Sequence, residues 1–282
     1  MVLSQAQIKG KIKNIAKANK ADPRILIRLY MMERFLERVA YSPYSEDFII
    51  KGGILVTSMV GVSMRSTIDI DTSIRNFNLS EVEAEKVVKE ICNVSLDDGT
   101  TFIVKEVSKI MDDMEYPGVR LALDAMMGEM VTPVKIDIST GDVITPKAIE
   151  YNYPLMLENR FIKLWSYNLE TILAEKLQTI LARGLLNTRM RDYYDIYKLM
   201  LYYRDEINYE IFKQAFVATC QNRNSNELIE HGKVIITNIS QDKKLIGLWE
   251  GYKKKYTYAE NISYESIIGS IEKLFDFIKS QL

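Results

Sequence analysis

Apolar residues at helical spacing dominate both ends of the chain. Between residues 4 and 40 they predict two helices, with Ser4 as the first N-cap and Asp22-Pro23 at the break between them. A further helix is expected from Ser80 to Cys92, because Ser80 stands at a capping position. From about Leu169 to the C-terminus, helical patterns prevail again.

Alternation of apolar and polar residues with a period of two is confined to the middle of the chain. It predicts strands at 68–71, 102–110, 119–127 and 131–139, and an apolar run at 48–50 precedes a helix-compatible segment at 54–60. The pattern changes after Pro154, so we place a boundary between residues 151 and 166. We expect an α+β fold in two domains: residues 1–155 with a mixed sheet and flanking helices, and residues 156–282 with helices alone.

Composition narrows the choice of partners. Hydrophobic residues make up 47% of the chain and charged residues 27%, as in folded globular proteins. The 37 lysines and arginines nearly balance the 38 aspartates and glutamates, so an RNA or DNA partner must meet a local basic patch. Lys253–Lys255 form such a cluster, although solvated surface is the commoner explanation. The two cysteines lack CxxC spacing and no apolar run resembles a secretory signal or a membrane span, which favours a cytoplasmic location.

Two aspartates lie two residues apart on one predicted strand. The period of a strand puts the carboxylates of Asp69 and Asp71 on one face, and Ile68 and Ile70 on the other. Carboxylates held this close repel each other unless a cation lies between them, and such oxygen ligands suit Mg²⁺ or Mn²⁺. An aspartate pair at a strand end can also lie on the solvent-exposed surface without binding a metal ion.

A third aspartate, Asp137, alternates with isoleucines on the strand at 131–139 in the same way. If the two strands are neighbours, three carboxylates can hold two metal ions. A pair of metal ions bridges nucleotide phosphates and lowers the pKa of an attacking hydroxyl, which is the chemistry of nucleotidyl transfer.

Gly52 and Gly53 lie between the apolar run at 48–50 and the helix expected at 54–60. Glycines at such a turn let the backbone approach a triphosphate and direct helix N-terminal amides toward it. A glycine pair is equally compatible with a tight turn that binds no phosphate.

Lys176 lies in the apolar stripe of the helix that starts at Leu169, between Ile172 and Ile180. Its ammonium is therefore expected to face the interior or a cleft, where it needs a phosphate or a carboxylate as partner. The alternative is that the stem packs and the charged end reaches water.

The following helix offers further candidates after the stop at Gly184. Projection on a helix puts Arg189 on the buried side and Asp192 at its edge, whereas Asp195 and Lys198 project outward. Arg189 and Asp192 are therefore site candidates, with Arg189 on the nucleotide, and Asp195 is assigned a structural role. An ordinary surface ion pair between Arg189 and Asp192 fits the same spacing.

Taken in order, five short motifs resemble the AbiEii/AbiGii toxin family. They are Lys51-Gly52-Gly53-Ile54, Arg65-Ser66-Thr67-Ile68-Asp69-Ile70-Asp71, Lys135 to Asp142, Ala174-Glu175-Lys176 and Arg191-Asp192-Tyr193-Tyr194-Asp195. The resemblance spans residues 48–201. It implies a nucleotidyltransferase-like sheet of the DNA polymerase β superfamily and a toxin of type IV toxin–antitoxin or phage-abortive systems.

The resemblance also implies roles for single residues. Gly52 and Gly53 would line the nucleotide phosphates, Asp69 and Asp71 would hold Mg²⁺ or Mn²⁺, and Asp137 would be the third acidic position. Lys176 and Asp192 match the helical motif needed for toxicity, with Lys176 on the triphosphate. Many superfamily members carry Gly-Ser where this chain has Gly52-Gly53, so one hydroxyl contact to phosphate is missing here.

The implied substrates are GTP or another NTP as donor and RNA such as tRNA as acceptor, with helices from both ends of the chain shaping the acceptor cleft. A cognate antitoxin is expected to act without a stable complex. Two alternatives stay open at this point. The acceptor can be a protein hydroxyl or a small molecule, or the chain can be a non-catalytic nucleotide-binding module.

Overall fold

The structure, a computed structural model, describes residues 3–75, 80–110 and 118–279. The chain divides into two compact units. The sheet unit comprises Met1–Asp142 and Ala148–Ser166, and the helical unit comprises Val143–Lys147 and Tyr167–Leu282. Among the described helices, none combines the length and the apolar character needed to cross a membrane.

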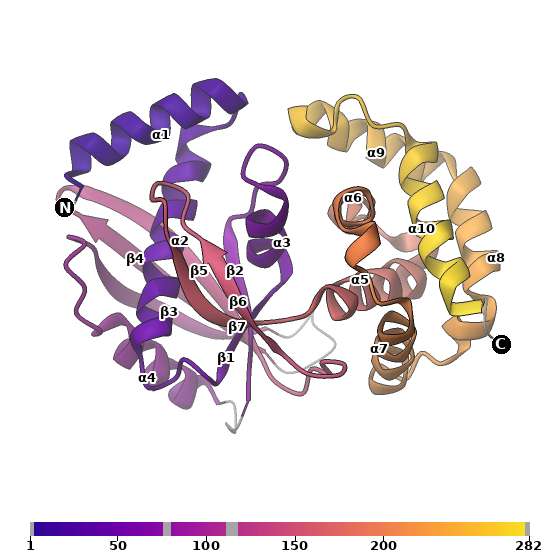
Figure 1. The fold of residues 1–282 in the computed structure, drawn as a ribbon, viewed down its shortest axis with the longest axis horizontal. Helices are drawn as coiled ribbons and strands as arrows, with labels where there is room; N and C mark the ends of the chain where they lie inside the picture. The colour runs from indigo at the N-terminus through magenta and orange to yellow at the C-terminus, as the bar shows by residue number, and fades with distance from the viewer. Residues whose placement is uncertain (1–2, 76–79, 111–117, 280–282) are drawn as a thin grey trace. The chain divides into compact units, whose positions relative to one another are not determined.

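The sheet unit combines a mixed sheet with helices, which confirms the expected α+β class (Figure 1). Its helices are α1 (Gln5–Asn19), α2 (Pro23–Tyr41), α3 (Gly52–Val60) and α4 (Glu81–Cys92). Its strands are β1 (Phe48–Lys51), β2 (Asp69–Ile74), β3 (Thr101–Ile110), β4 (Gly118–Met127), β5 (Met130–Ser139), β6 (Ile149–Pro154) and β7 (Phe161–Ser166).

The helix starts follow from their capping residues. The Ser4 hydroxyl accepts a hydrogen bond from the backbone N–H of Gln7. The side-chain oxygen of Gln7 accepts one from the backbone N–H of Ser4, which completes a capping box. Asp22 caps α2 with Pro23 at its first position, and Ser80 caps α4. All three starts were predicted from the sequence.

Two strands were missed. The sequence predicted neither β6 nor β7, yet they pair antiparallel with each other, and β7 pairs with β1 inside the sheet. The expected boundary after residue 155 would separate these two strands. The sheet unit instead extends to Ser166, because β7 hydrogen-bonds to β1 through Ile49 and Ile50.

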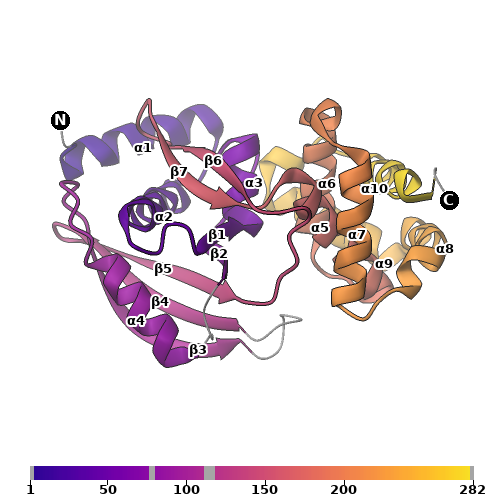
Figure 2. The same ribbon diagram turned by 60° about the horizontal axis from the view of Figure 1, so that its bottom comes forward.

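The strand order is β3-β4-β5-β2-β1-β7-β6, which makes β2 and β5 central neighbours. Figure 2 shows β3, β4 and β5 side by side, with α4 against them. β2 and β5 run parallel, with Asp71 opposite Asp137, whereas β1–β2 and β4–β5 are antiparallel. The register therefore aligns one residue from each of four strands in a row: Lys51, Asp71, Asp137 and Arg120.

One face of the sheet is apolar and covered by α2. The Phe35 ring of α2 meets the Phe102 ring of β3 edge to face, with centroids 5.8 Å apart. Ile70 and Ile136 are fully buried and share that face by strand alternation. Asp71 and Asp137 consequently project from the opposite face. Ile68 was expected beside Ile70, but it precedes β2 and is 38% exposed.

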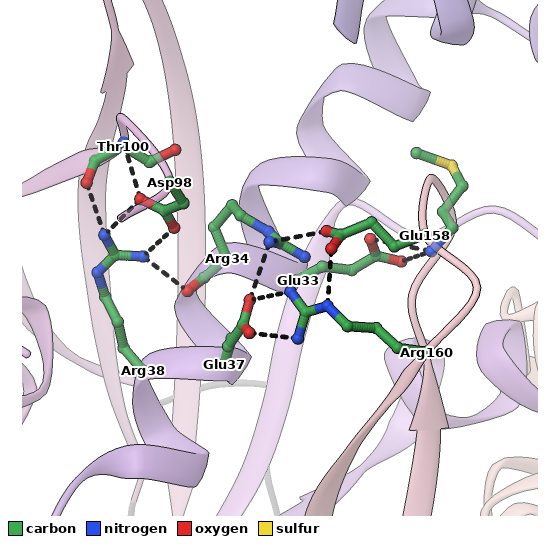
Figure 3. A network of polar contacts seen from close by, with 9 residues as sticks. Glu33, Arg34, Glu37, Arg38, Asp98, Thr100, Glu158 and Arg160 are labelled. Atoms are coloured by element: carbon green, nitrogen blue, oxygen red, sulfur yellow. Dashed lines mark hydrogen bonds and ion pairs between the residues drawn. The ribbon is translucent and has the colours of Figure 1, made fainter. Parts of the chain in front are cut away.

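A polar network, buried on the side of α2 and partly exposed at the turn, ties α2 to the turn between β6 and β7 (Figure 3). The Arg34 guanidinium pairs with Glu37 at 2.8 Å and with Glu158 at 3.0 Å, and Arg160 from the turn pairs with the same two carboxylates. Neighbouring Glu33 accepts the backbone N–H of Met156 at 3.0 Å. Burial raises the pKa of Glu33 to about 8, so this carboxyl is largely protonated at neutral pH.

A cavity of about 600 Å³ lies beside this network and is lined by α1, α2, residues 96–98 and the β6–β7 turn. Asp69, Asp71 and Asp137 are not among its lining residues.

The helical unit contains α5 (Leu169–Arg183), α6 (Met190–Tyr202), α7 (Tyr209–Asn222), α8 (Glu227–Gln241), α9 (Lys243–Lys255) and α10 (Tyr264–Lys279). Its core is aromatic and aliphatic, with Leu177, Tyr193, Phe216, Trp249 and Phe275 at most 1% exposed. α5 ends at Arg183 and is followed by Gly184, whose φ of 47° and ψ of −128° together favour glycine, as the predicted stop required.

Candidate active site

Asp69 and Asp71 occupy the first and third positions of β2 on the face away from α2. Burial raises the pKa of Asp69, and the charges of Asp71 and Asp137 raise it further, while Lys135 and Arg120 act in the opposite direction. The three carboxylates therefore lie close enough to repel one another. Repulsion of this kind is relieved by a bound cation or by a proton.

The glycine turn lies directly against this acidic strand. The Gly53 amide donates a hydrogen bond to Oδ2 of Asp71 at 3.0 Å. Gly52 has a φ of +59°, and a Cβ on it would lie 2.2 Å from the same oxygen. A Cβ on Gly53 would lie 2.6 Å from the Thr67 hydroxyl. Both glycines are thus required by close approach to side chains, and the Gly53 amide, expected on a phosphate, serves Asp71 here.

Asp137 is held by an arginine that the sequence analysis did not single out. Arg120 donates from Nε and Nη2 to the two carboxylate oxygens of Asp137, each at 2.7 Å. The hydrogen bonds that Arg120 donates to Asp137, together with the charges of Asp137, Asp69 and Asp71, keep the pKa of Arg120 raised against the opposing effect of burial. Arg120 remains 44% exposed, whereas Asp137 is 8% exposed at its side chain.

Within the described ranges, no group of three or more His, Cys, Asp or Glu side chains is arranged to hold a metal ion. The register brings Asp71 and Asp137 opposite each other, as expected, but both oxygens of Asp137 bind Arg120. The oxygen donors of Asp69 and Asp71 have the chemistry of a Mg²⁺ or Mn²⁺ ligand pair. The Asp69–Asp71 pair therefore fits a divalent cation, and Asp137 fits one only after release from Arg120.

Lys51 anchors the other side of the site. Its ammonium lies 2.7 Å from the Ser139 hydroxyl and 2.7 Å from Asp142, and all three side chains are buried. Burial acts to raise the pKa of Asp142, but the charge of Lys51 and the hydrogen bonds from Lys51, Ser139 and Ser73 lower it overall. This cluster fixes the end of β5 to the residue that precedes the glycine turn.

In the helical unit, Lys176 is buried as predicted, and its partners are aspartates. Its ammonium lies 3.1 Å from Asp192 and 2.7 Å from Asp195. Asp195 was expected to project outward, but its side chain is fully buried, and Lys198 is only 7% exposed. The projection was wrong because α6 packs against other helices on several sides, so most of its circumference is buried.

Arg189 was also misplaced by the projection. It is the N-cap residue of α6 rather than part of the helix, and its side chain is 50% exposed. Its Nε lies 3.3 Å from Asp192, which is the ordinary ion pair that the spacing left open.

The structure thus combines a mixed sheet, two carboxylates on a central strand and a glycine turn that opens a helix, which is the arrangement that the resemblance to nucleotidyltransferases implied. The family model for the nucleotidyl transferase AbiEii toxin of type IV toxin–antitoxin systems matches residues 34–275. The chain belongs to this family of nucleotidyltransferases. No curated protein matches it in sequence.

Three solved structures are similar at low identity. A candidate nucleotidyltransferase from H. pylori shares 16% identity over 92% of this chain and 97% of that one, with a TM-score of 0.48. JHP933 from Helicobacter pylori shares 15% over 92% and 95%, with a TM-score of 0.49. An antigenic nucleotidyltransferase-like protein from Paracoccidioides brasiliensis shares 14% over 83% and 94%, with a TM-score of 0.36.

Proposed function

We propose that this toxin-family nucleotidyltransferase depends on a divalent cation and transfers a nucleotidyl group from an NTP to RNA such as tRNA. The observation that carries the proposal is the contact between the glycine turn and the acidic strand. The Gly53 amide holds Asp71, Gly52 leaves room for its carboxylate, and Asp69 lies two residues before it. The backbone proposed to approach the phosphates and the carboxylates proposed to hold the cation are thereby adjacent.

The reaction assigned to this site is an in-line displacement at the α-phosphorus. The acceptor hydroxyl oxygen forms a bond to that phosphorus, the bond to the β-phosphate oxygen breaks, and pyrophosphate leaves with both bonding electrons. The hydroxyl proton passes to solvent. Mg²⁺ or Mn²⁺, when bound, lowers the pKa of the hydroxyl and neutralises phosphate charge.

The protein's own residues prepare the site. Asp69 and Asp71 would hold the cation, and Lys51 fixes the chain before the glycine turn through Asp142 and Ser139. Asp137 would join the ligands once Arg120 turns to the added phosphate charge. Arg120 is suited to this exchange because its side chain is partly exposed. Apart from Asp137, it interacts with Asp69 and Asp71 through charge.

Lys176 and Asp192 are proposed to support toxicity from the helical unit. Their ion pair orders α5 against α6, and Asp195 is a second, nearer carboxylate partner of the same buried ammonium. The family also implies a cognate antitoxin, and we propose that it acts without a stable complex with this chain.

The test is transfer of label from each NTP, in turn, to total tRNA in the presence of Mg²⁺. The wild type should label RNA, Asp69→Ala should not, and Asp124→Asn should behave as the wild type. Asp124 is a suitable control because it pairs with Lys105 on the same sheet. Transfer by the Asp69 variant at the wild-type rate would refute the site. Label on protein or on a small molecule instead of RNA would replace the proposed acceptor.

A further inference from the structure

A concentration of positive charge lies on α9, in a chain whose charges otherwise nearly cancel. This helix carries five lysines and a single acid, Glu250. Glu250 pairs with Lys253 at 2.8 Å, and among the described residues no carboxylate forms an ion pair with Lys254 or Lys255. Both of these lysines are exposed. Such a surface attracts a polyanion.

Aromatic rings accompany these lysines. Tyr256 and Tyr258 directly follow α9, are partly exposed, and stack on each other with centroids 5.2 Å apart and planes inclined by 20°. The Lys255 ammonium lies 5.3 Å from the centre of the Tyr256 ring. Lysines beside partly exposed aromatic rings are the combination used to bind single-stranded nucleic acid, because bases stack on rings while ammonium groups follow the phosphates.

The rings are held in place before any ligand binds. Tyr258 packs on Tyr194 with centroids 5.0 Å apart, and Tyr256 packs on Tyr252 at 4.7 Å. Tyr252 in turn stacks on Trp249, whose indole N–H donates to the Ile262 carbonyl at 3.0 Å. Little side-chain entropy therefore remains to be lost on binding.

A cation from another helix strengthens the positive potential here. Burial acts to raise the pKa of Tyr256, but the hydrogen bond from Arg191 of α6 and the charges of Arg191 and Lys255 lower it overall. Arg191 and Lys255 therefore both place positive charge beside the Tyr256 hydroxyl.

We infer that Arg191, Lys253–Lys255, Tyr256 and Tyr258 form a docking surface for a single-stranded segment of RNA. The inference rests on the proposed function, since that function requires an RNA acceptor. We call this docking surface the α9 surface. α1 also carries four lysines and no acid, but no aromatic residue interrupts them, so it lacks the stacking element.

The test measures binding of a short, labelled, mixed-sequence single-stranded RNA to the full chain by fluorescence anisotropy over a series of KCl concentrations. EDTA is present and NTP is omitted, so binding is observed without transfer. The test variant is Lys253→Gln/Lys254→Gln/Lys255→Gln. The control, Lys86→Gln/Lys105→Gln/Lys163→Gln, removes the same charge from α4, β3 and β7.

The α9 variant should lower the slope of log affinity against log salt by roughly 2, since each phosphate contact to a single strand contributes about 0.7. At about 0.15 M salt this corresponds to a loss of affinity on the order of 10- to 50-fold. Tyr256→Leu/Tyr258→Leu should weaken binding by about fivefold or more with an unchanged slope. The control should bind as the wild type.

Equal affinities of the α9 variant and the control would overturn the inference. So would a loss confined to Lys9→Gln/Lys13→Gln/Lys17→Gln on α1. The proposed function fails separately: RNA that binds the α9 surface but never receives label from any NTP would refute transfer to RNA and leave the docking surface standing.

Discussion

Substitution of Gly52 by alanine tests the contact between the glycine turn and the acidic strand. The φ of +59° is strained for alanine by about 1–2 kcal/mol. The new Cβ would lie 2.2 Å from Oδ2 of Asp71, below the 3.0 Å that such contacts keep. Asp71 must then leave the Gly53 amide, and a hydrogen bond to a charged group contributes about 1.5–3 kcal/mol. We expect a total destabilisation of roughly 2.5–5 kcal/mol, confined to the sheet unit.

Function should suffer as well, because a shift of about 1 Å in a catalytic group reduces turnover about a hundredfold. Peptide-resolved hydrogen exchange can report the stability of each unit separately, and label transfer reports activity. Gly10→Ala is the matched control: Gly10 lies within α1 and a Cβ there would meet no atom within 4 Å. The control should gain about 0.5–1 kcal/mol. Wild-type stability and transfer in Gly52→Ala would show that the close contact with Asp71 does not exist.

Three further predictions concern charged groups. Glu33 has a folded-state pKa of about 8, above its ordinary 4.5, so its stabilising contribution is complete below pH 4.5 and is lost as pH rises through 8. Urea unfolding of Glu33→Gln should lack this loss between pH 5 and 9, and an unchanged pH profile would contradict the burial of Glu33. Lys176→Met leaves Asp195 buried without its ammonium, so the helical unit should lose about 3–5 kcal/mol, and Lys176→Met/Asp195→Asn should recover much of it. Calorimetry checks both variants, and equal losses in them would contradict the ion pair. Arg120→Ala frees Asp137 and should tighten Mn²⁺ binding about fivefold, measured by electron paramagnetic resonance, whereas weaker binding would contradict the proposed exchange.

Local sequence patterns were enough to predict most of the helices and strands, including the strand β2 with its two aspartates. Alternation placed Asp69 and Asp71 on one face of β2, and the same alternation placed Asp137 on β5, because a strand's period of two is independent of its neighbours. The glycine pair between an apolar run and a helix likewise indicated the turn before α3. These predictions needed only residues close together in the chain.

Features set by pairing between distant segments could not be predicted in this way. Arg120 faces Asp137 because of the register between β4 and β5, which no single strand reveals. Asp142 was part of a recognised motif, but its partner Lys51 precedes it by 91 residues. Asp195 was misassigned because one apolar stripe predicts one buried side, whereas α6 is buried over most of its circumference.

The most direct test of the acidic site is anomalous X-ray scattering from crystals soaked with Mn²⁺ and a non-hydrolysable NTP. We predict a manganese peak bound by the carboxylates of Asp69 and Asp71, with a phosphate of the nucleotide beside Gly52 and Gly53. Manganese and nucleotide bound elsewhere on the protein, with both carboxylates left without a metal, would contradict the account.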